Sequence, residues 1–444
     1  MKGWRGPIRA TVAWTGLLLP SAEAAAESLE GADPHRAGSR DPRAETWRER
    51  EHLTGDWWGA RERWKELGLT WHGEWMGEAW ANLAGGLSRG VVVEGLAQMN
   101  LDLDLNRWTG WRMGRLRVGA ILPHGESPTG ERVGDLQGLS NIDAFRDELA
   151  PYEVCWEQDF GQGAWSLRTG LLTADVEFAF TDGGGNFLNS GFGWPAGIAL
   201  NTVNTGPAFF RSALGLRLRQ TVEETWQWQI GVYDGDTFDG DPTGDSATDF
   251  SLGGDDGWFV IGEVAKWRLG REGTLSRSHL RIGGWLHTAA FSDPDGDDWR
   301  GGTYVAVDIP IWADEDSEGT ASEACEAGAE PGRSVAAFAR CAWAPDASAE
   351  IEWSGDAGLL LAGWWPGRFD DVFGVGVAWA RRSDRARVIA SEPLLGEVAI
   401  EVTWRLSLSS WCQIQPDYQW ILSLGDATDR EAAHVIGIRT HLTF

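Results

Sequence analysis

The last ten residues, 435–444, most constrain what this chain can fold into, because their side chains alternate between an apolar and a polar face. One face carries Ile436, Ile438, Thr440, Leu442 and Phe444, and the other carries Val435, Gly437, Arg439, His441 and Thr443. This alternation predicts a β-strand with one side in an apolar environment. Such a strand ending on an aromatic is typical of bacterial outer-membrane barrels, whose assembly machinery is thought to read it. The alternative is an edge strand of a soluble sheet.

The N-terminal segment predicts export. Lys2, Arg5 and Arg9 precede a short apolar stretch over 12–19, and small residues suited to cleavage follow, so residues 1–24 are expected to form a secretory signal peptide. The apolar stretch is shorter than the roughly 20 residues that a membrane-spanning helix needs. The chain is therefore expected to be periplasmic, secreted or an outer-membrane barrel.

The composition favours the barrel. The chain has 29 Trp but only 4 Tyr, and Trp prefers membrane–water interfaces. Its 59 Gly suit tightly curved strands. The mean hydropathy of −0.29 is too polar for a helical membrane protein but fits a barrel with a wet lumen. The net charge of −28 argues against nucleic acid as a partner, because phosphates would be repelled.

The segment 93–105 shows the strand pattern most clearly. Its odd-numbered positions are apolar or Gly, whereas Glu94, Gln98, Asn100, Asp102 and Asp104 lie on the other face. Near-strict alternation over this length fits a tilted membrane strand, which needs about 9–11 residues. An acidic face cannot contact lipid, so it must line a lumen.

Sixteen segments of this kind predict an all-β, transmembrane antiparallel barrel of about sixteen strands over residues 69–444. We expect the strands near 69–80, 93–105, 114–122, 151–159, 165–172, 211–220, 225–234, 257–267, 278–288, 301–311, 333–343, 348–361, 371–381, 395–406, 410–422 and 433–444. The connections 123–150, 173–210, 235–256 and 312–332 are long, and we expect all of them at one end.

Two segments precede the barrel. Residues 25–52 are polar and aperiodic, which predicts a flexible leader. Residues 53–68 predict a short amphipathic helix, with Asp56 as its N-cap and Gly68 just past its end. Its apolar face would carry Trp57, Ala60, Trp64 and Leu67.

The long connection 173–210 combines aromatic, acidic and amide side chains. Asp175, Glu177, Asn189, Phe192 and Trp194 suit a sugar, because rings stack on its C–H faces while carboxylates and amides pair with its hydroxyls. Folded into the barrel, this loop would narrow the pore. The alternative is that the aromatics pack the loop against the wall.

Charged residues with lumen parity form a second set of candidates. Facing acidic and basic walls would create a transverse field that orders polar solutes; the alternative is that the charges pair and stiffen the wall. The set comprises Glu74 and Glu78 on the first strand, Arg115 and Arg117 on the third, Arg168 on the fifth, and Arg211, Arg217 and Arg219 on the sixth.

Cysteine, histidine and acidic patterns predict neither a metal site nor a catalytic site. The four Cys form no CxxC pair, although Cys325 and Cys341 flank a loop and could form a disulfide. The acid-rich stretches 234–245 and 293–298 lack the EF-hand order, so solvated loops are the better interpretation, with calcium left open. The eight His are scattered, H-E-x-x-H does not occur, and no nucleophile is paired with a histidine in the sequence.

The chain resembles carbohydrate-selective porins of the OprB type from about Leu53 to Phe444. The resemblance rests on the order and spread of several motifs. They are LTGDWWGAR at 53–61, NLAGGL at 82–87, LSNI at 139–142, LRTGLLTADVEF at 167–178, NSGFGWP at 189–195, IGGWLHT at 282–288 and QPDYQ at 415–419.

The resemblance implies a sixteen-stranded outer-membrane barrel for passive uptake of glucose-like sugars, without a cofactor. It also implies a constriction of arginine, acidic and aromatic side chains. We assign these roles to Glu78, Arg117, Arg168, Asp175, Glu177, Asn189, Phe192, Trp194 and Arg211. The acidic balance and scarcity of Tyr depart from the family.

The expected partners are mono- or oligosaccharides, outer-membrane lipids and, through Phe444, the barrel-assembly machinery; a homo-oligomer is compatible with this architecture. Three other functions stay open. They are a general cation-leaning porin without a sugar site, a soluble exported glycan-binding protein, and a barrel hydrolase using His72 or His287 as base.

Overall fold

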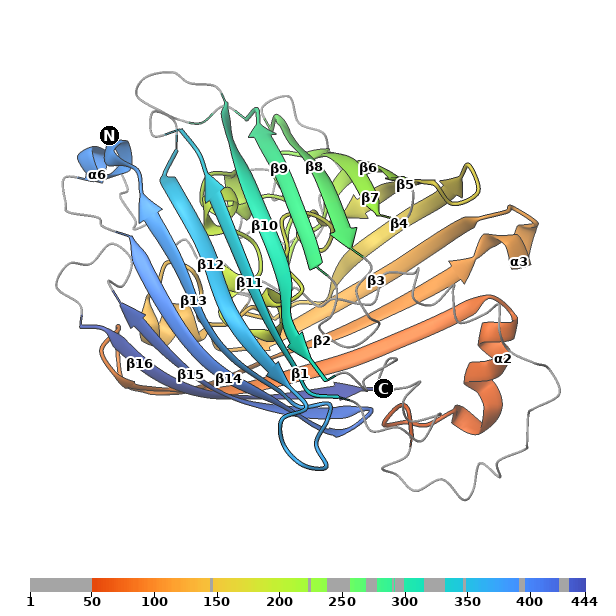
Figure 1. Cartoon of the computed structure of the whole chain (residues 1–444). Coiled ribbons are helices and arrows are strands. Elements are labelled where there is room, and N and C mark those ends of the chain that lie inside the picture. Colours follow the sequence, from red (N-terminus) through yellow and green to blue (C-terminus); the bar gives the residue numbers. More distant parts are fainter. Residues whose placement is uncertain are drawn as a thin grey trace.

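Each predicted strand is present, and each pairs with its neighbours in sequence until the last returns to the first. The computed structural model describes residues 50–143, 147–222, 225–237, 256–268, 278–289, 291, 299–314, 332–345, 349–390, 396–422 and 431–444. Within these ranges sixteen strands form one closed antiparallel barrel (Figure 1). Closure leaves no exposed sheet edge, which is what a strand-built membrane protein requires.

The strands are β1 (Leu69–Ala84), β2 (Gly90–Asp104), β3 (Gly114–Gly125), β4 (Ala150–Phe160), β5 (Trp165–Leu172), β6 (Ala213–Val222), β7 (Trp226–Asp234), β8 (Trp258–Arg268), β9 (Ser278–His287), β10 (Arg300–Ala313), β11 (Ser334–Trp343), β12 (Ile351–Ala362), β13 (Val372–Arg382), β14 (Glu397–Ser409), β15 (Cys412–Leu422) and β16 (Ala433–Thr443). The helices are α2 (Ala60–Glu66), α3 (Leu105–Thr109), α4 (Ala196–Ala199) and α6 (Asp384–Ala390). Single turns occur at Trp57–Gly59, Thr129–Val133, Gly184–Asn186, Ser190–Phe192 and Val203–Thr205.

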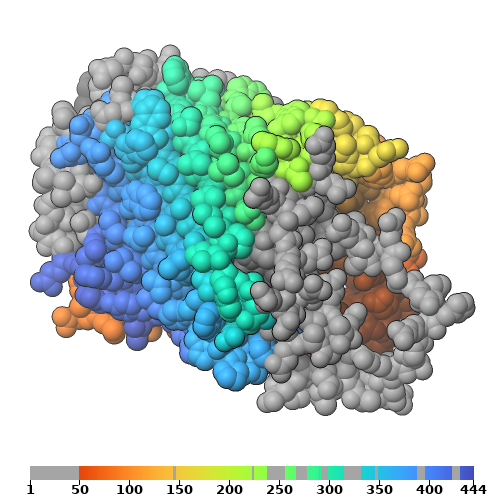
Figure 2. All heavy atoms as spheres, in the orientation of Figure 1, coloured from red at the N-terminus to blue at the C-terminus, as the bar shows by residue number. Residues whose placement is uncertain are grey.

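The alternation of side chains is confirmed. On β2, Val93 is 59% exposed on the outer face, whereas its neighbour Glu94 is 4% exposed inside. On β16, Ile436 and Ile438 are exposed outside, and Arg439 lies inside. Figure 2 shows β10–β14 side by side over one outer face of the barrel. No helix in the described ranges has the length and hydropathy to cross a bilayer.

The barrel closes between β1 and β16. Glu78 lies opposite Arg439 in this pairing, and the two side chains form an ion pair inside the barrel. The backbone N–H of Phe444 donates to the carbonyl oxygen of Gly73 at 2.8 Å. The chain end is thus part of the sheet, while its recognition by assembly machinery stays a prediction.

One expected long connection lies at the other end. The connections that follow β3, β5 and β7 leave the end of the barrel that carries α6, on the left in Figure 1. Because β10 runs opposite to those strands, the connection between Ala313 and Ser334 leaves the end that carries α2 and α3. The expectation that all four long connections share one end is therefore wrong for 312–332.

The N-terminal helix is shorter than expected. It covers Ala60–Glu66 after a single turn, and Asp56 makes no side-chain capping bond because Trp58 and Gly59 interrupt the helical backbone. Trp64 and Leu67 are exposed, so the expected apolar face is not buried. Instead Trp57 packs on Trp71 of β1, with ring centroids 5.0 Å apart.

Several expectations fall outside the described residues: the signal peptide 1–24, the leader up to residue 49, the acidic stretch 293–298 and nearly all of 238–245. Cys325 also lies there, so its pairing with Cys341 stays a prediction. The described cysteines Cys155, Cys341 and Cys412 form no disulfide with one another, and Cys341 lies on the outer face of β11.

Candidate functional site

The segment 173–212 between β5 and β6, here called the inward loop, folds into the barrel rather than away from it. Figure 1 shows its trace enclosed by the ring of strands. Its helix α4 packs on β11 and β12, far from the strands that the loop connects. The loop therefore crosses the lumen and reaches the opposite wall.

Carboxylates on the barrel wall hold the backbone of the inward loop. Glu401 of β14 accepts hydrogen bonds from the backbone N–H of Leu188 at 2.6 Å and of Asn189 at 2.8 Å. On β10, Asp308 accepts from the N–H of Asp182 at 3.1 Å and of Gly183 at 2.9 Å; on β8, Glu263 accepts from Ala179. These carboxyl oxygens satisfy N–H groups that would otherwise be buried without an acceptor, so the contacts fix the loop.

Arg340 of β11 complements the carboxylates by donating to backbone carbonyls of the same loop. Its guanidinium donates to the carbonyl oxygens of Ala179 at 2.6 Å and Gly191 at 2.9 Å, and to that of Gly193. It is also paired with Asp356, 2.7 Å away. The planar five-donor guanidinium is well suited to gather several carbonyls at once.

Residues 126–143 of the connection between β3 and β4 are held in the same manner. Glu397 of β14 accepts from the N–H of Leu136 at 2.7 Å and of Gln137 at 3.0 Å. Glu78 of β1 accepts from the hydroxyl of Ser140 at 2.7 Å while it also pairs with Arg439. Two segments thus narrow the lumen from one end.

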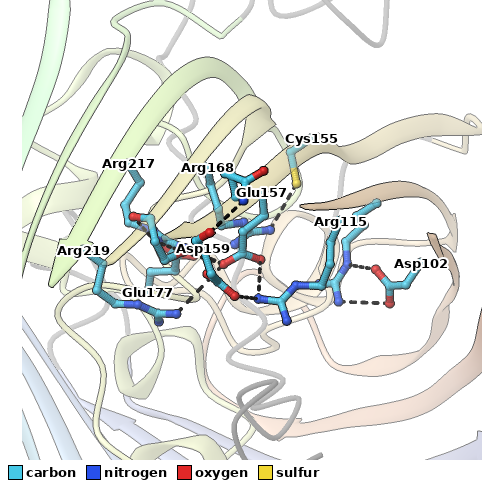
Figure 3. Close-up of polar contacts among 12 residues, drawn as sticks. Asp102, Arg115, Cys155, Glu157, Asp159, Arg168, Glu177, Arg217 and Arg219 are labelled. Atoms are coloured by element: carbon cyan, nitrogen blue, oxygen red, sulfur yellow. Dashed lines mark hydrogen bonds and ion pairs between the residues drawn. The ribbon is translucent and has the colours of Figure 1, made fainter. Parts of the chain in front are cut away.

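Below the inward loop, β2–β6 carry a ladder of arginines and carboxylates (Figure 3). The Glu177 carboxylate, from the loop, forms the end of the ladder nearest the loop and lies 2.5 Å from nitrogens of both Arg168 and Arg217. Pairs lower on the wall are Arg117–Asp102 and Arg115–Asp159, each 2.7 Å apart. This ladder comprises Asp102, Arg115, Arg117, Glu153, Glu157, Asp159, Arg168, Glu177, Arg217 and Arg219.

Exposure within the ladder increases away from the loop. The Arg217 and Arg168 side chains are 1% and 9% exposed, whereas that of Arg115, beside the first residue of β3, is 39% exposed. Arg117 and Arg219 are intermediate. The buried pairs nearest the loop therefore fix it, and the partly exposed pairs farther from the loop, the lower rungs, offer charged donors and acceptors to a solute.

The predicted transverse field between opposite walls is not what the structure shows. The arginines of β3, β5 and β6 pair with carboxylates of neighbouring strands on their own wall or of the loop, and wall carboxylates beyond the ladder bind backbone N–H groups. Pairing at 2.5–2.7 Å lowers the cost of holding these charges inside the barrel, as the alternative interpretation expects.

The structure brings some of the predicted site residues together and separates others. Arg117, Arg168 and Glu177 belong to the ladder. Glu78 lies at the barrel seam instead. Arg211 precedes β6 rather than lying on it, and its guanidinium sits over the Phe210 ring with the centroid 5.3 Å away.

The aromatic rings predicted to stack on a sugar do not face the open lumen. Phe192 and Trp194 are each 1% exposed. Phe192 stacks on Phe187 with centroids 4.4 Å apart, and Trp194 packs against Phe259 of β8. Asn189 is also buried, and its amide donates to Gln419. Burying these rings removes apolar area from water and seats the loop, which is the alternative interpretation of these residues.

The two acidic residues at the start of the inward loop have opposite electrostatic environments. Burial acts to raise the pKa of Glu177, but Arg217 and Arg168 outweigh it and hold that pKa well below its usual range. Burial raises the pKa of Asp175 to about 7, although the carboxylate accepts a hydrogen bond from the N–H of Phe209. Glu177 is thus charged at neutral pH, while Asp175 titrates near neutrality.

The wall residues that hold the loops were missed by sequence reasoning. They are Glu263, Asp308, Arg340, Glu397 and Glu401. Their signal in the sequence is a charged side chain on the lumen-facing side of a strand, flanked two positions away by small or apolar side chains. An example is Arg340 between Phe338 and Ala342 on β11. That pattern places a charge in the lumen but does not say which loop it meets.

Comparison with known proteins identifies the family. A family model described as "Carbohydrate-selective porin, OprB family" matches residues 88–444. The chain belongs to this family. It is an outer-membrane β-barrel of the carbohydrate-selective porins, a family of channels.

Individual relatives agree with this membership. The chain is similar to Porin B of Pseudomonas aeruginosa, with 22% identity over 93% of this chain and 94% of that protein. The high-pH structure of Pseudomonas putida OprB superimposes with a TM-score of 0.77 at 18% identity, covering 90% of this chain and 100% of that chain. Its low-pH structure gives a TM-score of 0.54 at 16% identity, covering 89% and 99%. These two structures show the same fold.

Replacing Glu401 with Ala tests the anchoring of the inward loop. The change leaves two buried N–H groups without an acceptor, so we expect it to lower the free energy of unfolding by about 2–4 kcal/mol and to increase open-channel current noise. Glu401→Gln keeps one acceptor oxygen, so its free energy of unfolding and its current noise should lie between those of wild type and Glu401→Ala. Glu352→Ala, which removes a carboxylate at the outer rim beside Arg381, is the control. Equal stability and noise in all variants would contradict the anchoring.

Asp175 gives a pH-dependent prediction. The folded state holds the Asp175 proton more tightly than the unfolded chain, so this group lowers stability as pH rises from about 4 to about 7. Asp175→Asn removes that loss, and we expect it to stabilise the barrel relative to wild type by about 1–3 kcal/mol at pH 8 but not at pH 4. Urea unfolding across this range measures the difference, and a difference independent of pH would contradict the assignment.

Proposed function

We propose that this porin passes carbohydrates by passive diffusion beneath the inward loop, along the exposed lower rungs of the ladder. The supporting observation is the half-exposed row of Arg115, Arg117 and Arg219 beside Asp102 and Asp159. Sugar hydroxyls both donate and accept, so they can exchange hydrogen bonds with water for bonds to guanidinium and carboxylate groups.

Pairing of the charges suits a neutral solute. A lone arginine would hold an anion, and a lone carboxylate a cation, but the pairs at 2.7 Å offer a solute alternating donors and acceptors with little net field. Passage through a channel needs binding that is favourable enough to enter and weak enough to leave. Exposed paired groups meet this requirement because water competes for them.

The inward loop determines the width of the path in this proposal, and its aromatics position it rather than stack on the solute. Transport then needs no bond-breaking step and no cofactor. His287, one of the two candidate bases of a hydrolase, is buried, with Nε2 facing the carbonyl oxygen of Gly235 and Nδ1 accepting from the N–H of Ala289. Both ring nitrogens thus meet backbone groups rather than a nucleophile.

A general cation-leaning porin is the competing function, and the net charge of −28 favours it. The two functions differ in what the ladder does. In a sugar channel the rungs bind hydroxyls, so sugar reduces the ion current in a saturable way. In a general porin the ladder only sets ion selectivity, and sugar leaves the current unchanged.

The double variant Arg115→Ala/Arg219→Ala separates these functions in planar bilayers titrated with glucose, a disaccharide and a charged control. We expect the wild type to show saturable sugar block and the variant to lose about tenfold in apparent sugar affinity, the equivalent of one or two hydrogen bonds. Arg381→Ala, which removes an arginine 53% exposed on the outer face, should not change it. Current in the wild type that is indifferent to sugar would overturn the proposal in favour of the general porin.

A further inference from the structure

Three side chains that bind metals converge where the inward loop meets β9 and β10, away from the ladder. They are Asp182 of the loop, His279 of β9 and Asp308 of β10, and one ligand atom from each lies within 4.8 Å of the other two. Among the residues that the structure describes, this is the one group of three or more His, Cys, Asp or Glu side chains that lie close enough to bind a single ion.

The fold, rather than chance proximity on one flexible segment, brings these groups together. His279 and Asp308 lie directly opposite each other in the β9–β10 pairing, so the sheet fixes their separation. Asp308 also accepts the backbone N–H groups of Asp182 and Gly183, which sets the position of Asp182 above the pair. The three ligands thus come from three elements held in mutual register.

The spacing of one pair of ligand atoms matches metal coordination. The Nδ1 atom of His279 lies 2.8 Å from a carboxylate oxygen of Asp182. Adjacent ligands of an octahedral ion bound at about 2.1 Å are about 3 Å apart, so a small ion fits this pair with little movement. A larger ion such as Ca²⁺, bound at about 2.3–2.6 Å, would require the ligands to spread.

The donor set selects the class of ion. Imidazole favours Zn²⁺, Fe²⁺, Ni²⁺ and Cu²⁺ over Mg²⁺ and Ca²⁺, and the two carboxylates supply the charge that balances a divalent ion. Asp182 is 38% exposed and His279 15% exposed, so the site opens to the lumen and leaves room for water as further ligands. The adjacent cation, Arg281, is occupied by Glu263 and by the face of Phe180.

We propose that Asp182, His279 and Asp308 bind a divalent first-row transition-metal ion that fastens the inward loop to β9 and β10. The ion replaces the contact between His279 and Asp182 with bonds to both, so it ties the loop to the wall by a stronger link than a hydrogen bond. Metal binding at this site depends on the folded barrel and the inward loop, and it does not depend on whether the channel passes sugars.

Isothermal titration of the refolded, untagged, EDTA-stripped barrel with ZnCl2 tests this site, with MgCl2 as the comparison ion. We expect one saturable zinc site per chain that His279→Asn weakens at least tenfold, together with weak or no magnesium binding. His279→Asn removes a ligand without touching the hydrogen bonds between Asp308 and the loop. If this variant fails to fold, Asp182→Asn changes an exposed ligand instead.

His441→Asn is the matched control, because His441 is another lumen-facing histidine 2.9 Å from a single carboxylate, Glu74. Zinc affinity should survive this change. Equal zinc binding by wild type and His279→Asn, or no saturable binding by the folded wild type, would overturn the proposal. In either case the direct contact between His279 and Asp182 accounts for the geometry without an ion.

Discussion

The inward loop can lie inside the barrel only because its backbone groups find partners there. A buried N–H or carbonyl without a partner costs free energy comparable to a lost hydrogen bond, and a segment that crosses a lumen has many of them. Wall carboxylates such as Glu401 and Asp308 accept its N–H groups, and Arg340 donates to its carbonyls. The narrowing of the channel, the burial of Phe192 and Trp194, and the convergence of Asp182 with His279 all depend on this set of contacts.

The same contacts divide the lumen between two tasks. Polar side chains on β8, β10, β11 and β14 hold the loop by hydrogen bonds to its backbone N–H and carbonyl groups. The wall β2–β6 keeps its charges paired side by side, with the exposed rungs at the end away from the loop. A neutral, hydroxyl-rich solute suits the second wall because every rung offers a donor beside an acceptor. Glu177 joins the two walls, since it belongs to the loop and pairs with Arg168 and Arg217.

Much of the barrel was predictable because the alternation of side chains is a local property of each strand. The segment 165–172 was predicted with the bounds of β5, and Arg117, Arg168 and Glu177 were placed in the lumen region. The fate of Trp194 was not predictable, because stacking on a sugar and packing on Phe259 require the same residue type. The partners of Glu401 lie more than 200 positions away in sequence, and no local pattern encodes such a pairing. The bounds of the N-terminal helix failed because Trp58 and Gly59 adopt left-handed backbone angles that interrupt it.

Hydrogen–deuterium exchange of the folded barrel in detergent tests the central claim most directly, since it reports on each backbone N–H group without altering the chain. If wall carboxylates hold the inward loop, the N–H groups of Ala179, Gly183, Leu188 and Asn189 should exchange as slowly as those of the neighbouring strands. Exchange of these four groups at the rate of an open loop, beside protected strands, would contradict the account and leave the barrel without its constriction.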